Sequence, residues 1–140
     1  MLERAILNKE KAGVDNVSFV ECTITGIALP DQIADCIISN CVINLIPEQE
    51  KQLAFNEMFR LLKPDGRLAI SDILTKKILP EELLKSMALY VGCISGASSV
   101  EGYEKYLQQA GFQCKNCYPA HDTSGIWSCD TNPIVVGQTS

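Results

Sequence analysis

The stretch that decides the fold is Asp35-Cys36-Ile37-Ile38-Ser39-Asn40-Cys41-Val42-Ile43-Asn44-Leu45. Its apolar, β-branched start predicts a strand buried on both faces. In an open α/β sheet, ligands bind outside the carboxyl ends of the strands, so we expect the polar residues that follow to lie at the mouth of a site. These residues are Ser39, Asn40, Cys41 and Asn44. The alternative is a plain strand and loop, with Cys41 as a small buried hydrophobe.

Composition limits the classes of protein to consider. A chain of 140 residues with 46% hydrophobic content suits one domain, residues 1–140, with a real core. The net charge of −5 comes without a basic block, so we expect no nucleic-acid partner. No apolar stretch has the length of a membrane span, and the start lacks the pattern of a secretory signal, so we expect a cytoplasmic protein with no membrane partner.

The seven cysteines of the chain are an odd number, which argues against a secreted disulfide framework. We therefore expect reduced thiols that are available to a soft ligand. Cys114 and Cys117 form a Cys-x-x-Cys pair, but a zinc site needs four ligands, and His121 and Cys129 are the nearby candidates. The pair also lies inside a strand pattern, which does not suit a redox motif. With a single histidine, the chain offers no arrangement typical of a hydrolase.

Helices and strands are expected to alternate along the chain. Apolar periodicity and end signals predict helices from Leu2 to a stop at Gly13, from Pro47 to Lys63, from Leu79 through Val91, and from a Ser99 cap to Gly111. Apolar runs predict strands at Val17–Cys22, Ala34–Ser39, Arg67–Ile73, Phe112–Tyr118 and Ile134–Val136. Lys63 to Gly66 should form a type I turn, and His121 to Asn132 is polar and irregular. This order indicates an α/β fold, with an antiparallel pair at the carboxyl end.

Several of these segments resemble a known family. The Asp35–Leu45 stretch, the segment Phe59–Leu68 and the pair Ser71-Asp72 together resemble the second half of class I S-adenosylmethionine-dependent methyltransferases. Within that class, the motifs Ser39–Leu45, Leu79-Pro80-Glu81-Glu82 and Tyr90–Ala97 resemble the arsenite methyltransferases. Two cysteine motifs about fifty residues apart in this order are more specific than the common Lys-Pro-x-Gly turn. The resemblance covers about Met1 to Phe112.

The resemblance implies a set of site residues. Cys41 and Cys93 match the thiols that bind trivalent arsenic, As(III), and soft thiolates suit this soft centre. In the family, a methyl group passes from S-adenosylmethionine to the lone pair of arsenic. The resemblance implies cofactor contacts beside the methionine part and the sulfonium. These contacts are Ser39, Asn40, Val42 and Ile43. Thr23 lies where the family often has a carboxylate facing the adenine amino group.

The chain also departs from the family pattern. The Gly-x-Gly-x-Gly loop of the family and the first two strands of its doubly wound, Rossmann-like sheet would precede Met1, and the third arsenic-binding cysteine normally lies upstream as well. Asp65 replaces the first glycine of the usual Pro-Gly-Gly turn. We therefore expect the later two-thirds of the fold, with cofactor binding and activity weakened or lost. An exposed sheet edge also predicts a homodimer or a strand-swapped assembly.

Three functions are compatible with these features. The first is methyl transfer to thiol-bound As(III) or its thiol conjugates. The second is a non-enzymatic module in which Cys41 and Cys93 bind As(III) or another soft metal. The third is a pseudoenzyme that pairs with a full-length relative, its thiols being merely buried.

Overall fold

The computed structural model describes residues 1–75, 96–118 and 124–130. The elements in chain order are α1 (Leu2–Ala12), β1 (Ala34–Asn40), the 3-10 turn η1 (Ile43–Leu45), α2 (Glu48–Leu61), β2 (Leu62–Ile73), α5 (Val100–Ala110), β3 (Gln113–Tyr118) and β4 (Ser124–Asp130). The expected helix from Leu79 through Val91 and the expected strand Ile134–Val136 lie outside the described residues.

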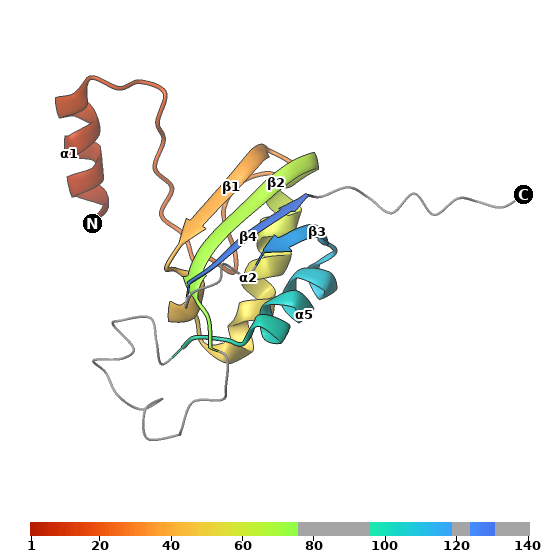
Figure 1. The fold of residues 1–140 in the computed structure, drawn as a ribbon. Helices are drawn as coiled ribbons and strands as arrows, with labels where there is room; N and C mark the ends of the chain where they lie inside the picture. Colours follow the sequence, from red (N-terminus) through yellow and green to blue (C-terminus); the bar gives the residue numbers. More distant parts are fainter. Residues whose placement is uncertain (76–95, 119–123, 131–140) are drawn as a thin grey trace, which may run out of the picture.

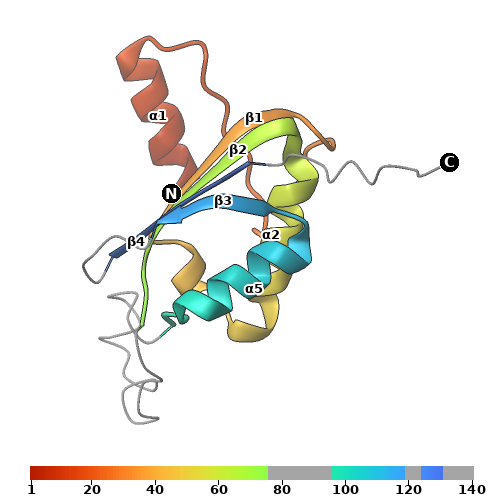
Figure 2. The same cartoon turned by 45° about the vertical axis from the view of Figure 1, so that its right-hand side comes forward.

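The described strands form one mixed sheet in the order β1-β2-β4-β3. β1 and β2 are parallel, with Ile37 opposite Leu68 and Asn40 opposite Ser71, whereas β4 is antiparallel to both β2 and β3. Figures 1 and 2 show α2 and α5 side by side on the same face of this sheet. The fold is therefore α/β, and the carboxyl ends of its two parallel strands meet at one edge.

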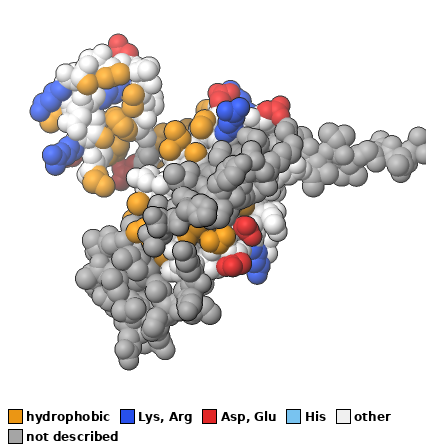
Figure 3. All heavy atoms as spheres, in the orientation of Figure 1, with side chains coloured by type: hydrophobic (Ala, Val, Ile, Leu, Met, Phe, Trp, Pro, Cys, Tyr) orange, Lys and Arg blue, Asp and Glu red, His pale blue; other side chains and the backbone are white. Residues whose placement is uncertain are grey.

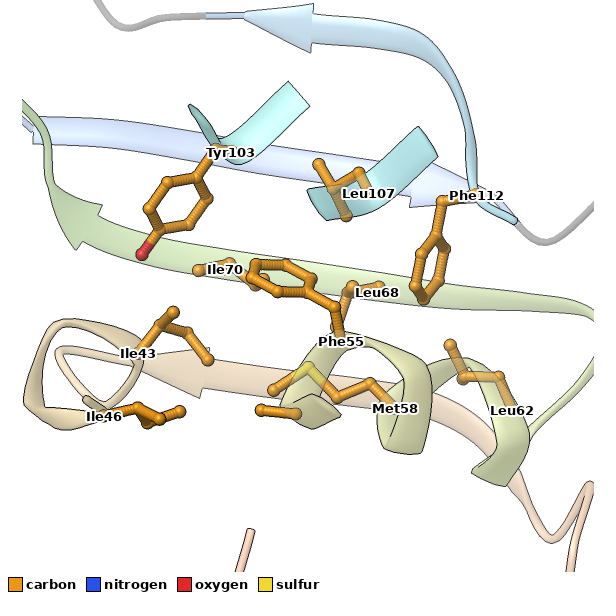
Figure 4. Packing of buried hydrophobic residues seen from close by; sticks show 11 residues of the cluster. Ile43, Ile46, Phe55, Met58, Leu62, Leu68, Ile70, Tyr103, Leu107 and Phe112 are labelled. Carbon is orange, nitrogen blue, oxygen red and sulfur yellow. The ribbon is translucent and has the colours of Figure 1, made fainter. Parts of the chain in front are cut away.

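The core lies between this helix pair and the sheet (Figure 4). Phe55 of α2 meets the ring of Tyr103 of α5 edge to face, with ring centroids 5.7 Å apart and an interplanar angle of 86°. Leu68 and Ile70 of β2 point up into the same cluster, and both are about 1% exposed. Contacts of this kind stabilise a core beyond the area that they bury. α2 and α5 therefore have their places fixed against the sheet and against each other.

The predicted ends of two helices are confirmed. α1 ends at Gly13, which takes a left-handed conformation with a φ of 61°. At the start of α5, the Ser99 side chain accepts a hydrogen bond from the Gly102 amide at 3.1 Å, and Gly111 ends the helix. Local capping chemistry was sufficient to predict these boundaries.

Two strand predictions are wrong. Residues 17–22 form no strand, although three of them are apolar, because a strand requires a partner for its backbone groups and no described strand lies beside this segment. The antiparallel partner of β3 is β4, at Ser124–Asp130, within the polar stretch expected to be irregular. β4 also pairs with β2 on its other side, so the backbone groups of this polar segment have partners in both neighbouring strands.

β1 was expected to be buried on both faces, and this is also wrong. Its Ile38 side chain is 80% exposed and Cys36 is exposed as well, whereas Ser39 is buried. The reason is that β1 is an edge strand of the described sheet and the described helices that pack on the sheet cover only one of its faces.

The turn after α2 differs in type from the prediction. β2 already begins at Leu62, and Lys63 to Gly66 form an irregularity in its pairing with β1. Asp65 has a φ of 65°, and a left-handed third residue belongs to a type II turn rather than a type I turn. Asp65 adopts this left-handed conformation itself, which aspartate tolerates better than most residues, so the turn keeps its shape without glycine at this position.

α1 lies apart from the sheet, on the side away from α2 and α5 (Figures 1 and 2). It has no buried residue, and Ile6 and Leu7 are both more than 40% exposed. Figure 3 shows apolar side chains on this helix and on the surface of the described residues facing it. The amphipathic pattern therefore predicted the helix correctly, but its apolar side is exposed.

The segment before α5 is attached to the rest of the fold by a buried lysine. The Lys51 side chain of α2 is 1% exposed, and its ammonium donates hydrogen bonds of 2.7 Å to Glu48, to the Gly96 carbonyl and to the Ser98 hydroxyl. All three donor positions of the ammonium are thereby used, which is what allows a charge to be buried. Lys51 therefore fixes the segment 96–98 onto α2.

We expect Lys51→Met to lower the free energy of unfolding by about 2 to 3 kcal/mol, because the Gly96 carbonyl and the Ser98 hydroxyl would lose their buried donor. Urea denaturation measures this change. The matched control is Lys63→Met, which removes an exposed ion pair with Asp35 and should cost less than about 1 kcal/mol. Equal effects of the two substitutions would contradict the assigned role of Lys51.

Gly96 also approaches the 3-10 turn closely. A Cβ atom at this position would lie 1.9 Å from the carbonyl oxygen of Asn44. We expect Gly96→Ala to destabilise the chain by about 3 kcal/mol, because two backbone segments would have to separate. Gly26→Ala is the control, since its Cβ would meet nothing closer than the Thr23 hydroxyl at 3.6 Å, and it should cost less than about 1 kcal/mol. Similar melting temperatures for both variants would overturn the expectation.

Candidate functional site

Cys41 lies directly after β1, at the carboxyl end of the parallel pair. Its backbone is in the left-handed region, with a φ of 53°, and its amide donates to the Ser71 carbonyl at 2.9 Å. The side chain is exposed, and the thiol lies 3.8 Å from the Asn40 side-chain oxygen. A left-handed cysteine is uncommon, and such strained residues cluster at functional sites. The Cys41 thiol is thus exposed at the position where α/β sheets bind ligands.

An apolar groove of about 350 Å³ runs beside β1, between its exposed edge, α2 and the loop before β1. Three of the predicted cofactor contacts line it, namely Ser39, Asn40 and Val42. The rest of the lining is apolar and includes Ile24, Ile37 and Met58. Among the described residues, the buried Ser39 hydroxyl has no hydrogen-bond partner. A groove of this size with a few polar groups at one end is typical of a small-molecule site.

The loop wall of the groove is held by Arg60 at the end of α2. Its guanidinium donates to the carbonyls of Ile27 and Leu29 at 3.0 and 2.9 Å, and it pairs with Glu57 and Asp31. Glu57 in turn accepts from the Ile27 amide at 2.6 Å. The hydrogen bond from Arg60 lowers the pKa of Glu57 to about 2, so this pair stays ionised at neutral pH.

The other two predicted cofactor contacts lie elsewhere. Thr23 is bridged to Gly26 in the loop before β1 and is not part of the groove lining, although its neighbour Ile24 is. The Ile43 side chain is fully buried in the core, and its amide points at a carboxylate on β2. Three of the five residues are therefore brought together around the groove, and Thr23 and Ile43 are not.

Asn44, expected at the mouth of the site, is instead fully buried. Its side-chain amide donates to the Ile73 carbonyl at 2.7 Å, and its oxygen lies 3.3 Å from the Tyr103 hydroxyl. A buried amide with partners on both sides has a structural role. Asn44 therefore fixes the 3-10 turn to β2.

Asp72 is the most buried carboxylate described, and no role for it was predicted from the sequence. Its Oδ2 atom accepts from the Tyr103 hydroxyl at 2.8 Å and from the Ile43 amide at 3.2 Å. Burial raises the pKa of Asp72, and the Tyr103 hydroxyl and the backbone amides of Ile43 and Cys41 offset only part of this effect. Its position at the end of a predicted strand is the sequence signal for a residue near the site, but only the structure shows which residues it contacts.

Cys93, the second predicted thiol, lies outside the described residues. Within the described ranges, no three histidine, cysteine, aspartate or glutamate side chains come close enough to hold a metal ion. β3 contains Cys114 and Cys117, so the Cys-x-x-Cys pair lies within a strand as expected. No helix in the described part is long and apolar enough to span a membrane.

A second hollow, of about 260 Å³, lies between the end of α2 and the loop before β1. It is lined by Asp31, Arg60 and Lys63 among others, and β2 begins there. Ligands of α/β sheets bind at the other end of the strands, and the Arg60 guanidinium is already bonded within the protein. The groove beside Ser39 is therefore the better candidate for a binding site.

The chain is similar to curated arsenite methyltransferases. It is 33% identical to the enzyme of Halobacterium salinarum over 133 residues, which are 93% of this chain and 34% of the relative. It is 40% identical to the enzyme of Aquipseudomonas alcaligenes over 106 residues, and 35% identical to the human enzyme over 108 residues. These matches cover 74% of this chain in both cases, and 30% and 28% of the relatives. The chain thus spans about a third of the length of the relatives it matches.

Solved structures agree with this likeness. An arsenic(III) S-adenosylmethionine methyltransferase from Chlamydomonas reinhardtii superimposes with a TM-score of 0.67 and 26% identity, over 92% of this chain and half of that one. A Bacillus protein, YcgJ, has a TM-score of 0.69 at 22% identity and covers 81% of this chain and 48% of its own, which shows the fold alone. The model described as "Methyltransferase domain" matches residues 1–111, most of the chain. The chain therefore belongs to the methyltransferase domain family.

Proposed function

We propose that the chain is the arsenic-binding and methionine-side part of an S-adenosylmethionine-dependent arsenite methyltransferase. The observation that carries this proposal is the Cys41 thiol, exposed on a left-handed turn at the carboxyl end of β1 and next to the groove lined by Ser39, Asn40 and Val42. The relatives' names and the arsenic(III) methyltransferase structure support the same substrate class.

As(III) is the substrate, and its ligands in this proposal are the thiolates of Cys41 and Cys93. Thiolate sulfur is a soft donor and matches a soft, thiophilic centre. One contact between backbone segments supports a shared site for the two thiols. Gly96, three residues after Cys93, packs on the Asn44 carbonyl, three residues after Cys41. Three residues span at most roughly 11 Å of backbone, so the length of the chain allows both cysteines to reach one site near this contact.

The residues around the groove fit the methionine side of the cofactor. When bound, S-adenosylmethionine supplies an activated methyl group to the arsenic lone pair. The unsatisfied Ser39 hydroxyl and the exposed Asn40 amide would bind its polar groups, and Val42 would exclude water beside them. In this proposal these residues form the wall of the site beside the methionine part of the cofactor.

The partner in this proposal is a second copy of the chain. β1 is an edge strand of the described sheet, and its exposed Ile38 offers an apolar surface beside unpaired backbone groups. Such edges pair with strands of other chains. We propose a homodimer or strand-swapped assembly, working in the cytoplasm, where the reducing conditions keep thiols available. A monomer at tens of micromolar by light scattering would contradict this assembly.

A second candidate function is As(III) binding without methyl transfer. The observation that favours it is the exposed Cys41 thiol, because a thiol can hold arsenic without any contact to a cofactor. Cofactor binding is therefore the property that separates the two functions.

Calorimetric titration of the reduced chain with S-adenosylmethionine, with and without As(III), is the deciding experiment. We expect As(III) binding in the wild type and a roughly 10²-fold weaker affinity in Cys41→Ser, because one thiol of a chelating pair is lost. Cys36→Ser is the matched control, an exposed thiol on the same strand, and should bind arsenic as the wild type does. Cofactor binding supports methyl transfer. Its absence up to millimolar concentration, with arsenic still bound, would leave the binding module.

The backbone of Cys41 gives an independent prediction. With a φ of 53°, residue 41 is in a conformation that glycine adopts without strain and alanine does not. We expect Cys41→Gly to be about 1 kcal/mol more stable than Cys41→Ala in urea denaturation, although both lack the thiol. Equal stabilities would mean that the turn relaxes when the cysteine is removed.

A further inference from the structure

Asp72 connects the loop that carries Cys41 to the two elements beside it. The carboxylate is 2% exposed, at the end of β2. Its Oδ2 atom accepts two hydrogen bonds, from the Ile43 amide in the loop and from the Tyr103 hydroxyl of α5. In Figure 4 the Tyr103 ring reaches from α5 towards Ile43. The loop is therefore held at residues 41 and 43, by the Ser71 carbonyl and by this carboxylate.

This arrangement costs stability. Among the described residues, the Oδ1 atom of Asp72 has no hydrogen-bond partner, and burial raises the pKa of the carboxyl. The charged or titratable side chains that face it are Tyr103 of α5 and Lys51 of α2, and the backbone amides of Ile43 and Cys41 in the loop face it as well. Burial and the charge of Asp72 raise the pKa of Tyr103 in turn, so Tyr103 remains a hydrogen-bond donor. A buried carboxylate with one unsatisfied oxygen is not what core packing alone would favour.

We propose that Asp72, oriented by Tyr103, is a positioning residue for the Cys41 thiol. By holding the Ile43 amide, the carboxylate keeps the left-handed turn at Cys41 and so fixes the direction of the thiol relative to the groove end formed by Asn40 and Val42. Asp72 contacts no reacting group in this role. The inference rests on the proposed function, because it assigns a purpose to the thiol direction.

The test uses two matched pairs of variants. Tyr103→Phe removes the hydroxyl that orients Asp72, whereas Tyr106→Phe removes a hydroxyl from the same helix that bonds Glu48 instead. Asp72→Ala removes the acceptor of both hydrogen bonds. In the wild type both bonds end on the Oδ2 atom of Asp72, so the single side-chain oxygen of asparagine in Asp72→Asn can still accept both. Tyr103→Phe also keeps the inference testable if Asp72→Ala does not fold.

Two readouts do not depend on arsenic. The first is hydrogen exchange of the Ile43 amide, which we expect to accelerate about tenfold in Asp72→Ala, as for a lost bond to a charged acceptor, and to recover to within about twofold in Asp72→Asn. The second is the alkylation rate of Cys41, mapped by mass spectrometry, with Cys22 and Cys36 as internal controls in the same chain. Tyr103→Phe and Asp72→Ala should change the rate of Cys41 alone, and Tyr106→Phe should change none.

As(III) affinity is the third readout, and we expect it to fall roughly tenfold in Tyr103→Phe and Asp72→Ala, the usual effect of removing a group that orients a ligand. Loss of global stability with unchanged Cys41 alkylation and unchanged Ile43 exchange would overturn the inference and leave Asp72 as a structural residue. If the wild type binds no arsenic while the first two readouts change as expected, the proposed function fails and the positioning of the thiol stands.

The pH dependence of stability gives a further check. Because the pKa of Asp72 is raised above its ordinary 3.8, the folded state holds this proton more tightly than the unfolded state. The wild type should therefore lose stability relative to Asp72→Asn as the pH rises from 3.8 through the raised folded value, and the difference should then level off. If the difference in stability stays constant across this range, the Asp72 carboxylate is not desolvated, which would contradict the conclusion that its burial costs stability.

Discussion

The edge-to-face contact between Phe55 of α2 and Tyr103 of α5 links the core to the candidate site. The two helices cover one face of the sheet, and this contact sets the position of the Tyr103 ring between them. The ring carries its hydroxyl to Asp72, at the end of β2, and Asp72 holds the loop after β1. Since the core is packed like a crystal rather than a liquid, a shift of either helix would be passed on to the Cys41 turn.

Much of the fold could be predicted from local patterns. The ends of α1 and α5 followed from Gly13, Ser99 and Gly111, because capping is decided within a few residues. Strands were harder, since each one depends on a partner that is distant in sequence. The apolar segment 17–22 has no described partner and stays irregular, whereas polar Ser124–Asp130 is a strand because β2 and β3 lie on its two sides.

The candidate site was predictable to a similar extent. The position of Cys41 followed from the rule that parallel strands offer their carboxyl ends to ligands, and Ser39, Asn40 and Val42 do lie together at the groove. The network of Asp72, Tyr103 and Ile43 could not be predicted, because its members are about thirty residues apart and meet only in the folded core. For the same reason Asn44, polar and next to the site, was expected at its mouth and is buried in the fold instead.

The two sides of the groove region respond differently to acid. The loop wall is held by Arg60, and its partner Glu57 has a pKa of about 2, so this ion pair is kept as the pH falls and is lost only near that value. The strand-end side is held by Asp72, whose raised pKa means that it takes up a proton well before Glu57 does. As the pH falls, the Asp72 carboxylate under the thiol loop is therefore neutralised first, while Glu57 and Arg60 still hold the groove wall. The two carboxyl groups thus take up protons at different pH values, so one side of the site can be neutralised while the ion pair on the other side is kept.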